Sequence, residues 1–125
     1  MSKVQNEDRS QITIYHNAQC SKSTSACNLL LERDASVKVV NYLDTPPDRE
    51  ELLHLLALLG MKPSQLIRKN EPVFIEFYVE RNLTEADYFQ AMLNHPILIE
   101  RPIIVKEDNK AIIGRPPESV LDFLY

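Results

Sequence analysis

Cys20 is the residue of this sequence with the clearest chemical potential, because of where it stands. The alternating apolar run Gln11–Tyr15 predicts a short strand, and the pattern of Ser21–Arg33 predicts a helix. Cys20 lies between them, where unpaired backbone N–H groups and the positive end of a helix dipole favour a thiolate, the reactive form of a thiol. The same geometry can hold a tetrahedral oxyanion beside the sulfur.

The first turn of the predicted helix strengthens this interpretation. It contains Ser21, Lys22, Ser23 and Thr24, and no acidic residue follows until Glu32, so no side chain cancels the positive end. His16, just upstream, is placed to act as a hydrogen-bond donor or a cation near the sulfur. The alternative is that Cys20 is an ordinary small residue and the serines merely cap the helix. Composition leaves both interpretations open.

Cys27 is predicted to be a packing residue. It lies two helical turns beyond Cys20, about 10.5 Å along the axis, whereas a disulfide requires Cα atoms within about 7 Å. The pair therefore cannot close without unwinding the helix. The chain thus lacks a resolving cysteine of its own, and an external thiol must complete any redox cycle.

No metal site is predicted. The three histidines and two cysteines form none of the short-spaced pairs typical of zinc ligands. His54 is expected on the solvated side of a helix, and His95, before Pro96, in a structural turn. With only two glycines, a phosphate-binding glycine loop is also absent from the sequence.

The composition describes an ordinary globular chain of 125 residues with 44% hydrophobic residues and a net charge of -4. We expect a flexible tail over residues 1–10 and a single domain over residues 11–125. The negative charge argues against a nucleic-acid partner, and no apolar run predicts a membrane helix. With two cysteines and no export signal, we expect a protein of the reducing cytoplasm, monomeric and without a bound cofactor.

The predicted elements follow the order β-α-β, a helical middle, then β-β-α. A leucine stripe predicts the clearest middle helix, which Gly60 ends. Pro72–Glu80 is ambiguous, because its strand propensity conflicts with its helical surroundings. The other predicted elements are the strand Val37–Val40, the short helix Pro63–Lys69, the helix Thr84–Leu93 capped by Thr84, the hairpin strands Ile103–Lys106 and Lys110–Ile113, and the helix Glu118–Leu124.

Several separated segments resemble the glutaredoxin- and glutathione-dependent arsenate reductases. The resemblance extends from about residue 11 to residue 125, and its motifs occur in the same order as in that family. The matching segments are Ile12–Ser23, Leu66–Pro72, His95–Ile103, Gly114–Pro116 and Val120–Asp122.

The resemblance implies an α/β, thioredoxin-like fold: β-α-β and β-β-α parts, a helical insertion between them, and a mixed sheet of about four strands. It assigns Pro72–Glu80 to a helix, against local propensity. It also implies that Pro102 is a cis-proline that precedes the third strand and faces the reactive thiol.

Residue by residue, the resemblance makes Cys20 the nucleophile and His16 an assistant in thiolate formation. Arg68, Arg101 and Arg115 match the arginines that bind the oxyanion, a role suited to permanently charged, bidentate guanidinium groups. Ser21, Lys22 and Ser23 are expected to complete the substrate-binding helix start. Thr24 departs from the family, because many relatives have arginine there.

The implied activity is reduction of arsenate to arsenite, with glutathione as co-substrate and glutaredoxin as partner. Phosphatase-like arsenate reductases are excluded, because their Cys-x5-Arg motif would need arginine in place of Ala26. Two alternatives on the same fold stay open: a redox-responsive, regulator-like protein that binds a partner, and a thiol reductase of another substrate. Ser23 argues against the regulators, which typically carry a second cysteine at that position.

Overall fold

The computed structural model describes residues 12–33 and 37–124, which form two compact units. The sheet unit comprises the described residues up to Tyr42 and from Arg101 onward, and the helical unit comprises residues 43–100. The tail predicted over residues 1–10 lies outside the described residues. The single domain over residues 11–125 stays a prediction.

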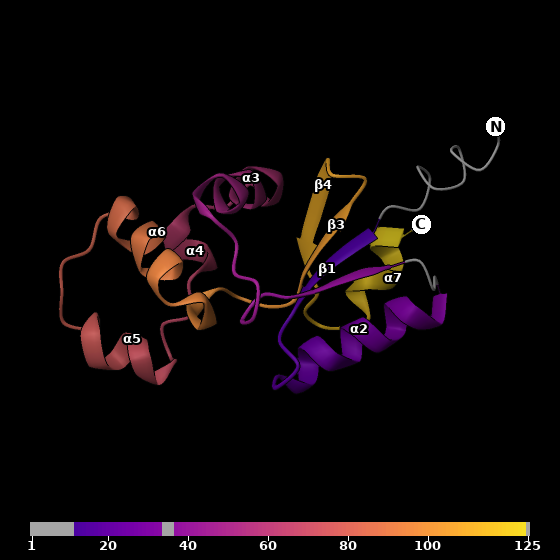
Figure 1. Cartoon of the computed structure of the whole chain (residues 1–125), viewed down its shortest axis with the longest axis horizontal. Helices are drawn as coiled ribbons and strands as arrows, with labels where there is room; N and C mark the ends of the chain where they lie inside the picture. The colour runs from indigo at the N-terminus through magenta and orange to yellow at the C-terminus, as the bar shows by residue number, and fades with distance from the viewer. Residues whose placement is uncertain (1–11, 34–36, 125) are drawn as a thin grey trace. The chain divides into compact units, whose positions relative to one another are not determined.

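The sheet unit contains a mixed four-stranded sheet in the order β2-β1-β3-β4. β1 is parallel to β2 and antiparallel to β3, and β4 pairs antiparallel with β3 (Figure 1). Two helices belong to this unit and contact each other. The bounds of its elements are β1 Ile12–His16, α2 Ser21–Arg33, β2 Lys38–Asn41, β3 Ile103–Lys106, β4 Lys110–Ile113 and α7 Ser119–Leu124.

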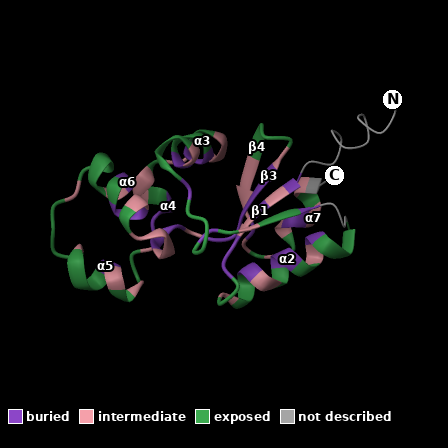
Figure 2. Cartoon of the chain, in the orientation of Figure 1, coloured by how far each residue is buried: buried purple, intermediate pink, exposed green. Residues whose placement is uncertain are grey.

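The core of the sheet unit lies between the sheet and these helices. Alternate residues of β1, Ile12 and Ile14, are buried, as expected for a strand with one covered face. α2 contributes Ala26, Cys27 and Leu30 to the same cluster. Figure 2 shows this burial as purple along β1, β3 and the inner side of α2. Because α2 packs against one face of the sheet, the position of its first turn relative to the end of β1 is fixed.

The helical unit consists of short helices whose ends have clear signals. Asp48 caps α3 by accepting from Glu51 N at 2.8 Å, and Gly60 ends it in the left-handed conformation at φ 66°. Thr84 and Asp87 form a capping box on α6. The bounds are α3 Arg49–Leu59, α4 Pro63–Leu66, α5 Pro72–Phe77, α6 Glu85–Asn94 and a 3-10 turn over Pro96–Leu98.

Most predicted elements are confirmed, with shifted ends. α4 stops at Leu66, not at Lys69 as predicted, because Ile67 leaves the helix to form a β-bridge with Ile99. Pro72–Glu80 does contain a helix, α5, but this helix ends at Phe77. β1 ends one residue later than predicted, and β2 lies one residue later than predicted.

The hairpin and the closing segment agree with the sequence analysis, with one addition. β3 and β4 have the predicted bounds, and the turn between them places Glu107 and Asp108 at positive φ. The Arg101–Pro102 peptide is cis, as expected. The Arg115–Pro116 peptide is also cis, which the sequence analysis did not predict. In the described part of the chain, no helix combines the length and apolarity needed to span a membrane.

Candidate active site

The loop between β1 and α2 is closed by its own hydrogen bonds around Asn17. The carbonyl of Asn17 accepts from Cys20 N at 3.0 Å, and its side-chain Oδ1 accepts from Gln19 N at 2.9 Å. Its own N–H donates to Ser23 Oγ at 3.0 Å. Asn17 is buried, so these bonds hold Cys20 at the first turn of α2. Asn17 is not among the predicted site residues, although asparagine after a strand is a turn signal.

Two of the predicted arginines lie beside the thiol. Arg115 Nη2 is 3.2 Å from Cys20 Sγ, and Arg115 Nε donates to the carbonyl of Arg101 at 2.7 Å. Arg101 is itself buried and its side chain hydrogen-bonds Cys20. The residues that carry these charges flank β3 and β4, so the sheet brings them to the end of β1 where Cys20 stands.

The pKa of the Cys20 thiol is lowered by these surroundings. Partial burial acts most strongly and raises the pKa, but four favourable interactions together outweigh it. They are the backbone N–H of Ser23, the side chain of Arg101, the backbone N–H of Lys22 and the charge of Arg115. The helix start therefore favours the thiolate through its N–H groups, as predicted, and two guanidinium groups add to this effect.

His16 and Ser23 lie under the loop. His16 Nδ1 is 2.7 Å from Ser23 Oγ, and both side chains are buried. Burial lowers the pKa of His16, against a smaller raising effect of a hydrogen bond with the backbone of Ser23. The imidazole is therefore neutral near pH 7, which disfavours the interpretation of His16 as a cation and favours that of a hydrogen-bonding group.

This geometry limits which group of Ser23 is available to bind a substrate. Its hydroxyl is fully buried and engaged by His16 and Asn17, so only its backbone N–H faces the thiol. The side chains of Ser21 and Lys22, by contrast, are exposed at the helix start. The predicted substrate-binding role of Ser23 therefore rests on its backbone.

Arg68 lies in the helical unit, in an acidic setting. Its Nε donates to Glu71 Oε2 at 3.1 Å, and its Nη1 pairs with Glu100 Oε1. Arg101 and Arg115 are the predicted arginines that interact with Cys20 within the sheet unit, and the role of Arg68 stays a prediction.

Cys27 is a core residue, as predicted. It is 6% exposed, and burial raises the pKa of its thiol. Neither cysteine is in a disulfide. Thr24, where many relatives have arginine, donates to the Ala18 carbonyl at 3.5 Å.

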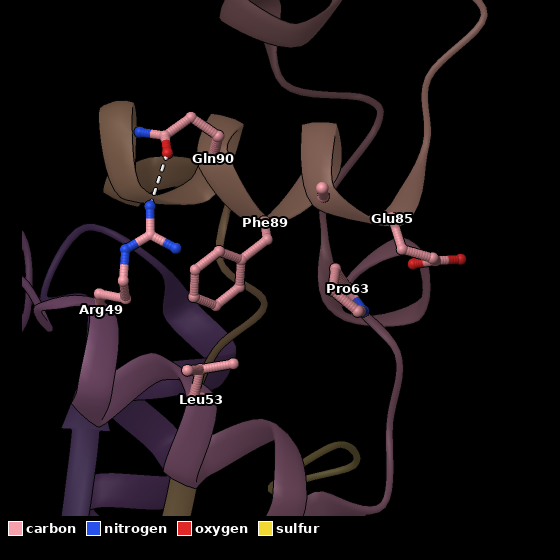
Figure 3. A pocket seen from close by; sticks show the side chains of 7 residues that line it. Arg49, Leu53, Pro63, Glu85, Phe89 and Gln90 are labelled. Carbon is pink, nitrogen blue, oxygen red and sulfur yellow. Dashed lines mark hydrogen bonds between the residues drawn. The ribbon is translucent and has the colours of Figure 1, made fainter.

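A pocket of about 360 Å³ in the helical unit does not coincide with these residues. Figure 3 shows Arg49 bound to Gln90, with Phe89 and Leu53 beside it and with Pro63 and Glu85 further along. Arg49 also lies over the Phe89 ring, 5.2 Å from its centroid. None of the predicted site residues lines this pocket. Across residues 12–33 and 37–124, no group of three or more His, Cys, Asp or Glu residues is arranged to hold a metal ion.

Comparisons with known proteins agree with the fold. The ArsC family model matches residues 15–123. The chain is 45% identical to an uncharacterised Escherichia coli K12 protein, YfgD, over 91% of this chain and 97% of that one. It is 39% identical to an arsenate reductase of Neisseria meningitidis, over 88% and 95% of the two chains. A solved arsenate reductase from Vibrio cholerae superposes with a TM-score of 0.82 at 39% identity, covering 90% of this chain and 97% of that one.

The sheet order, the cis-proline before β3 and a cysteine at the start of α2 define a thioredoxin-like protein with an inserted helical unit. Within that class, the chain belongs to the ArsC family.

Proposed function

We propose that this protein is an arsenate reductase that uses the Cys20 thiolate as nucleophile and glutathione and glutaredoxin as external reductants. The observation that carries this proposal is the contact of Arg115 with Cys20 at the start of α2, in a chain of the ArsC family. Relatives at 39–40% identity are named arsenate reductases, which supports the substrate.

In the first step, the Cys20 thiolate attacks arsenic. A bond forms between Sγ and arsenic(V), and one arsenate oxygen leaves as water after protonation. Arg101 and Arg115 lie where they can neutralise the charge of the bound oxyanion, while the N–H groups of Lys22 and Ser23 hold the thiolate. The exposed side chains of Ser21 and Lys22 are candidates for further contacts with the oxyanion.

In the second step, arsenic is reduced. A glutathione thiolate attacks Cys20 Sγ, the sulfur–arsenic bond breaks, and its electron pair stays on arsenic, which becomes arsenic(III) and leaves as arsenite. The two sulfurs are oxidised together to a mixed disulfide. Glutaredoxin then exchanges with this disulfide and restores the Cys20 thiol.

The position of Cys27 supports the use of external thiols. Cys27 is buried in the core two turns away along α2, so it is not available to resolve a disulfide on Cys20. A compartment that keeps glutathione reduced, such as the cytoplasm, suits this cycle.

The proposal is tested by coupling the purified protein to NADPH oxidation through glutathione, glutaredoxin and glutathione reductase. We expect NADPH loss that requires arsenate, both thiol partners and Cys20. Cys20→Ser is the essential control, and Cys27→Ser is the matched variant that should retain turnover. Replacing glutaredoxin with thioredoxin and its reductase tests the choice of reductant.

Failure of wild-type turnover, with the coupling system proven on a known arsenate reductase, would contradict the proposal. Retained turnover in Cys20→Ser would contradict the assignment of the nucleophile. Turnover of a glutathione-mixed disulfide without turnover of arsenate would instead identify a thiol reductase of another substrate.

A further inference from the structure

The guanidinium of Arg68 is already engaged by two carboxylates. Glu71 accepts from Nε at 3.1 Å, and Glu100 accepts from Nη1. The Arg68 and Glu71 side chains are only 16% and 13% exposed, and Glu100 is 29% exposed, so solvent screens these charges incompletely. The three side chains form what we call the Arg68 cluster.

The backbone holds the Arg68 cluster in place. Arg68 N donates to the Leu98 carbonyl at 2.7 Å, and Glu100 N donates to the Leu66 carbonyl at 3.1 Å. Ile67 and Ile99, between them, form an antiparallel bridge. Arg68 and Glu100 are therefore held side by side on two paired segments, and their ion pair does not depend on two freely rotating surface chains.

Such a setting opposes the binding of an anion. The cluster carries one positive and two negative charges, whereas an isolated arginine would present an uncompensated cation. A guanidinium binds a tetrahedral oxyanion best through two parallel N–H groups. Nε already donates to Glu71 and Nη1 to Glu100, so either edge of the guanidinium that could hold an oxyanion through two N–H groups includes a nitrogen that also donates to a carboxylate.

We infer that Glu71 and Glu100 set the oxyanion affinity of the protein by competing for Arg68. They keep ground-state binding weak for arsenate and equally for phosphate, which has the same shape and charge. This inference rests on the proposed function and adds to it the prediction, made from the family resemblance, that Arg68 binds the oxyanion. Weak ground-state binding leaves the thiol accessible in the presence of phosphate, which cannot be reduced.

The kinetic test uses Glu71→Gln and Glu100→Gln, which remove a negative charge but keep a hydrogen-bond acceptor. Glu76→Gln is the matched control, because Glu76 is an exposed glutamate of the same unit. We expect each cluster variant to lower both the arsenate KM and the phosphate inhibition constant by about two- to fivefold, with kcat unchanged. The control should leave both constants unchanged. Unchanged or higher constants in both cluster variants would overturn the inference.

A binding test separates this inference from the proposed function. In Cys20→Ser protein, the ¹⁵N resonance of Arg68 Nε, assigned by its loss in Arg68→Gln, is followed during titration with sodium phosphate. We expect the resonance to shift, with half-saturation at lower phosphate when Glu100→Gln is added.

The two failures have different signatures. If wild-type protein reduces arsenate while the Arg68 resonance never responds to phosphate, the inference is wrong and the reductase assignment stands on Cys20, Arg101 and Arg115. If the resonance responds as expected but arsenate is not reduced, the competition at Arg68 is supported and the proposed activity is wrong.

Discussion

Arg115 Nη2 lies 3.2 Å from Cys20 Sγ, a contact between residues 95 positions apart in the chain. The same guanidinium donates through Nε to the carbonyl of Arg101, just before the cis-proline. The Arg115 side chain thus contacts both the reactive sulfur and the segment that leads into β3. The charge and the hydrogen-bonding geometry of Arg115 should therefore both affect the thiol.

Replacing Arg115 with glutamine should raise the pKa of the Cys20 thiol and slow its reaction near neutral pH. The pKa rises because the thiolate loses a positive charge in contact, while the effect of burial remains. The rate of alkylation by iodoacetamide, measured against pH, reports this pKa. We also expect kcat/KM for arsenate to fall by about a hundredfold or more, as when one oxyanion donor is removed.

Arg33→Gln is the control for this experiment. Arg33 is exposed at the far end of α2, so its loss changes the net charge equally without touching the sulfur. Equal alkylation profiles for wild-type and Arg115→Gln protein would mean that the contact does not tune the thiol.

His16 should make the folded protein less stable in mild acid. Because burial lowers the pKa of His16 in the folded state, the unfolded chain binds its proton more readily, with a pKa of about 6.5. This contribution to the free energy of unfolding is therefore complete above that value and is lost as the pH falls through the lowered folded pKa.

Urea unfolding between about pH 8 and pH 5 measures this loss. The experiment is best done in Cys20→Ser protein, which removes the titration of the thiol. Adding His16→Gln should flatten the pH dependence, whereas His54→Gln, at an exposed position, should preserve it. An identical acid dependence with and without His16 would exclude the buried neutral imidazole.

Cys27→Ala should retain arsenate turnover and lower the free energy of unfolding by about 1 kcal/mol through lost packing. Cys27 is a buried member of the sheet-unit core and its thiol pKa is raised, so native protein should react with one equivalent of a thiol reagent, at Cys20. Mass spectrometry after brief alkylation identifies the modified residue. Rapid modification of Cys27 in folded protein would contradict its burial.

Gly114→Ala should lower the free energy of unfolding more than most substitutions at surface positions do. A Cβ there would lie 2.7 Å from Ile104 Cδ1 and 3.1 Å from Pro102 Cγ, in the core directly before Arg115. Overpacking of this kind costs about 1–3 kcal/mol. Thermal unfolding, together with the alkylation rate of Cys20, measures the effect on the fold and on the site.

Gly60→Ala separates crowding from backbone strain. Gly60 has φ 66°, but a Cβ there meets no atom within 4 Å. We expect a loss of about 1 kcal/mol from the left-handed conformation alone, with normal Cys20 reactivity. If both alanine variants alter Cys20 alkylation equally, Gly114 has no special role in placing Arg115.

Local sequence signals predicted the helices and strands well where no long-range contact acted against them. The bounds of α2 are those predicted, because capping residues begin it and apolar residues at helical spacing continue it. α5 forms despite strand propensity, with Pro72 in its first turn and Phe74 buried. α4 is shorter than predicted because the bridge between Ile67 and Ile99 is a long-range contact that local sequence does not reveal.

The sequence predicted which residues belong to the site, but it could not predict the contacts between them. The position of Cys20 before a helix free of early acids indicated a stabilised thiolate, and the resemblance supplied Arg101 and Arg115. No spacing rule could show that Arg115 touches the sulfur, since this depends on how β3 and β4 pair with β1. The burial of the Ser23 hydroxyl likewise depends on tertiary packing around His16.

The discontinuous sheet unit has a consequence for the newly made protein. Because the ribosome produces Cys20 long before Arg101 and Arg115, a nascent chain carries the thiol without the guanidinium groups that stabilise its charge. β3, which pairs with β1, is likewise made only after the whole helical unit. During synthesis Cys20 thus lacks two of the four interactions that lower its pKa, and these are added only when β3 and β4 join the sheet.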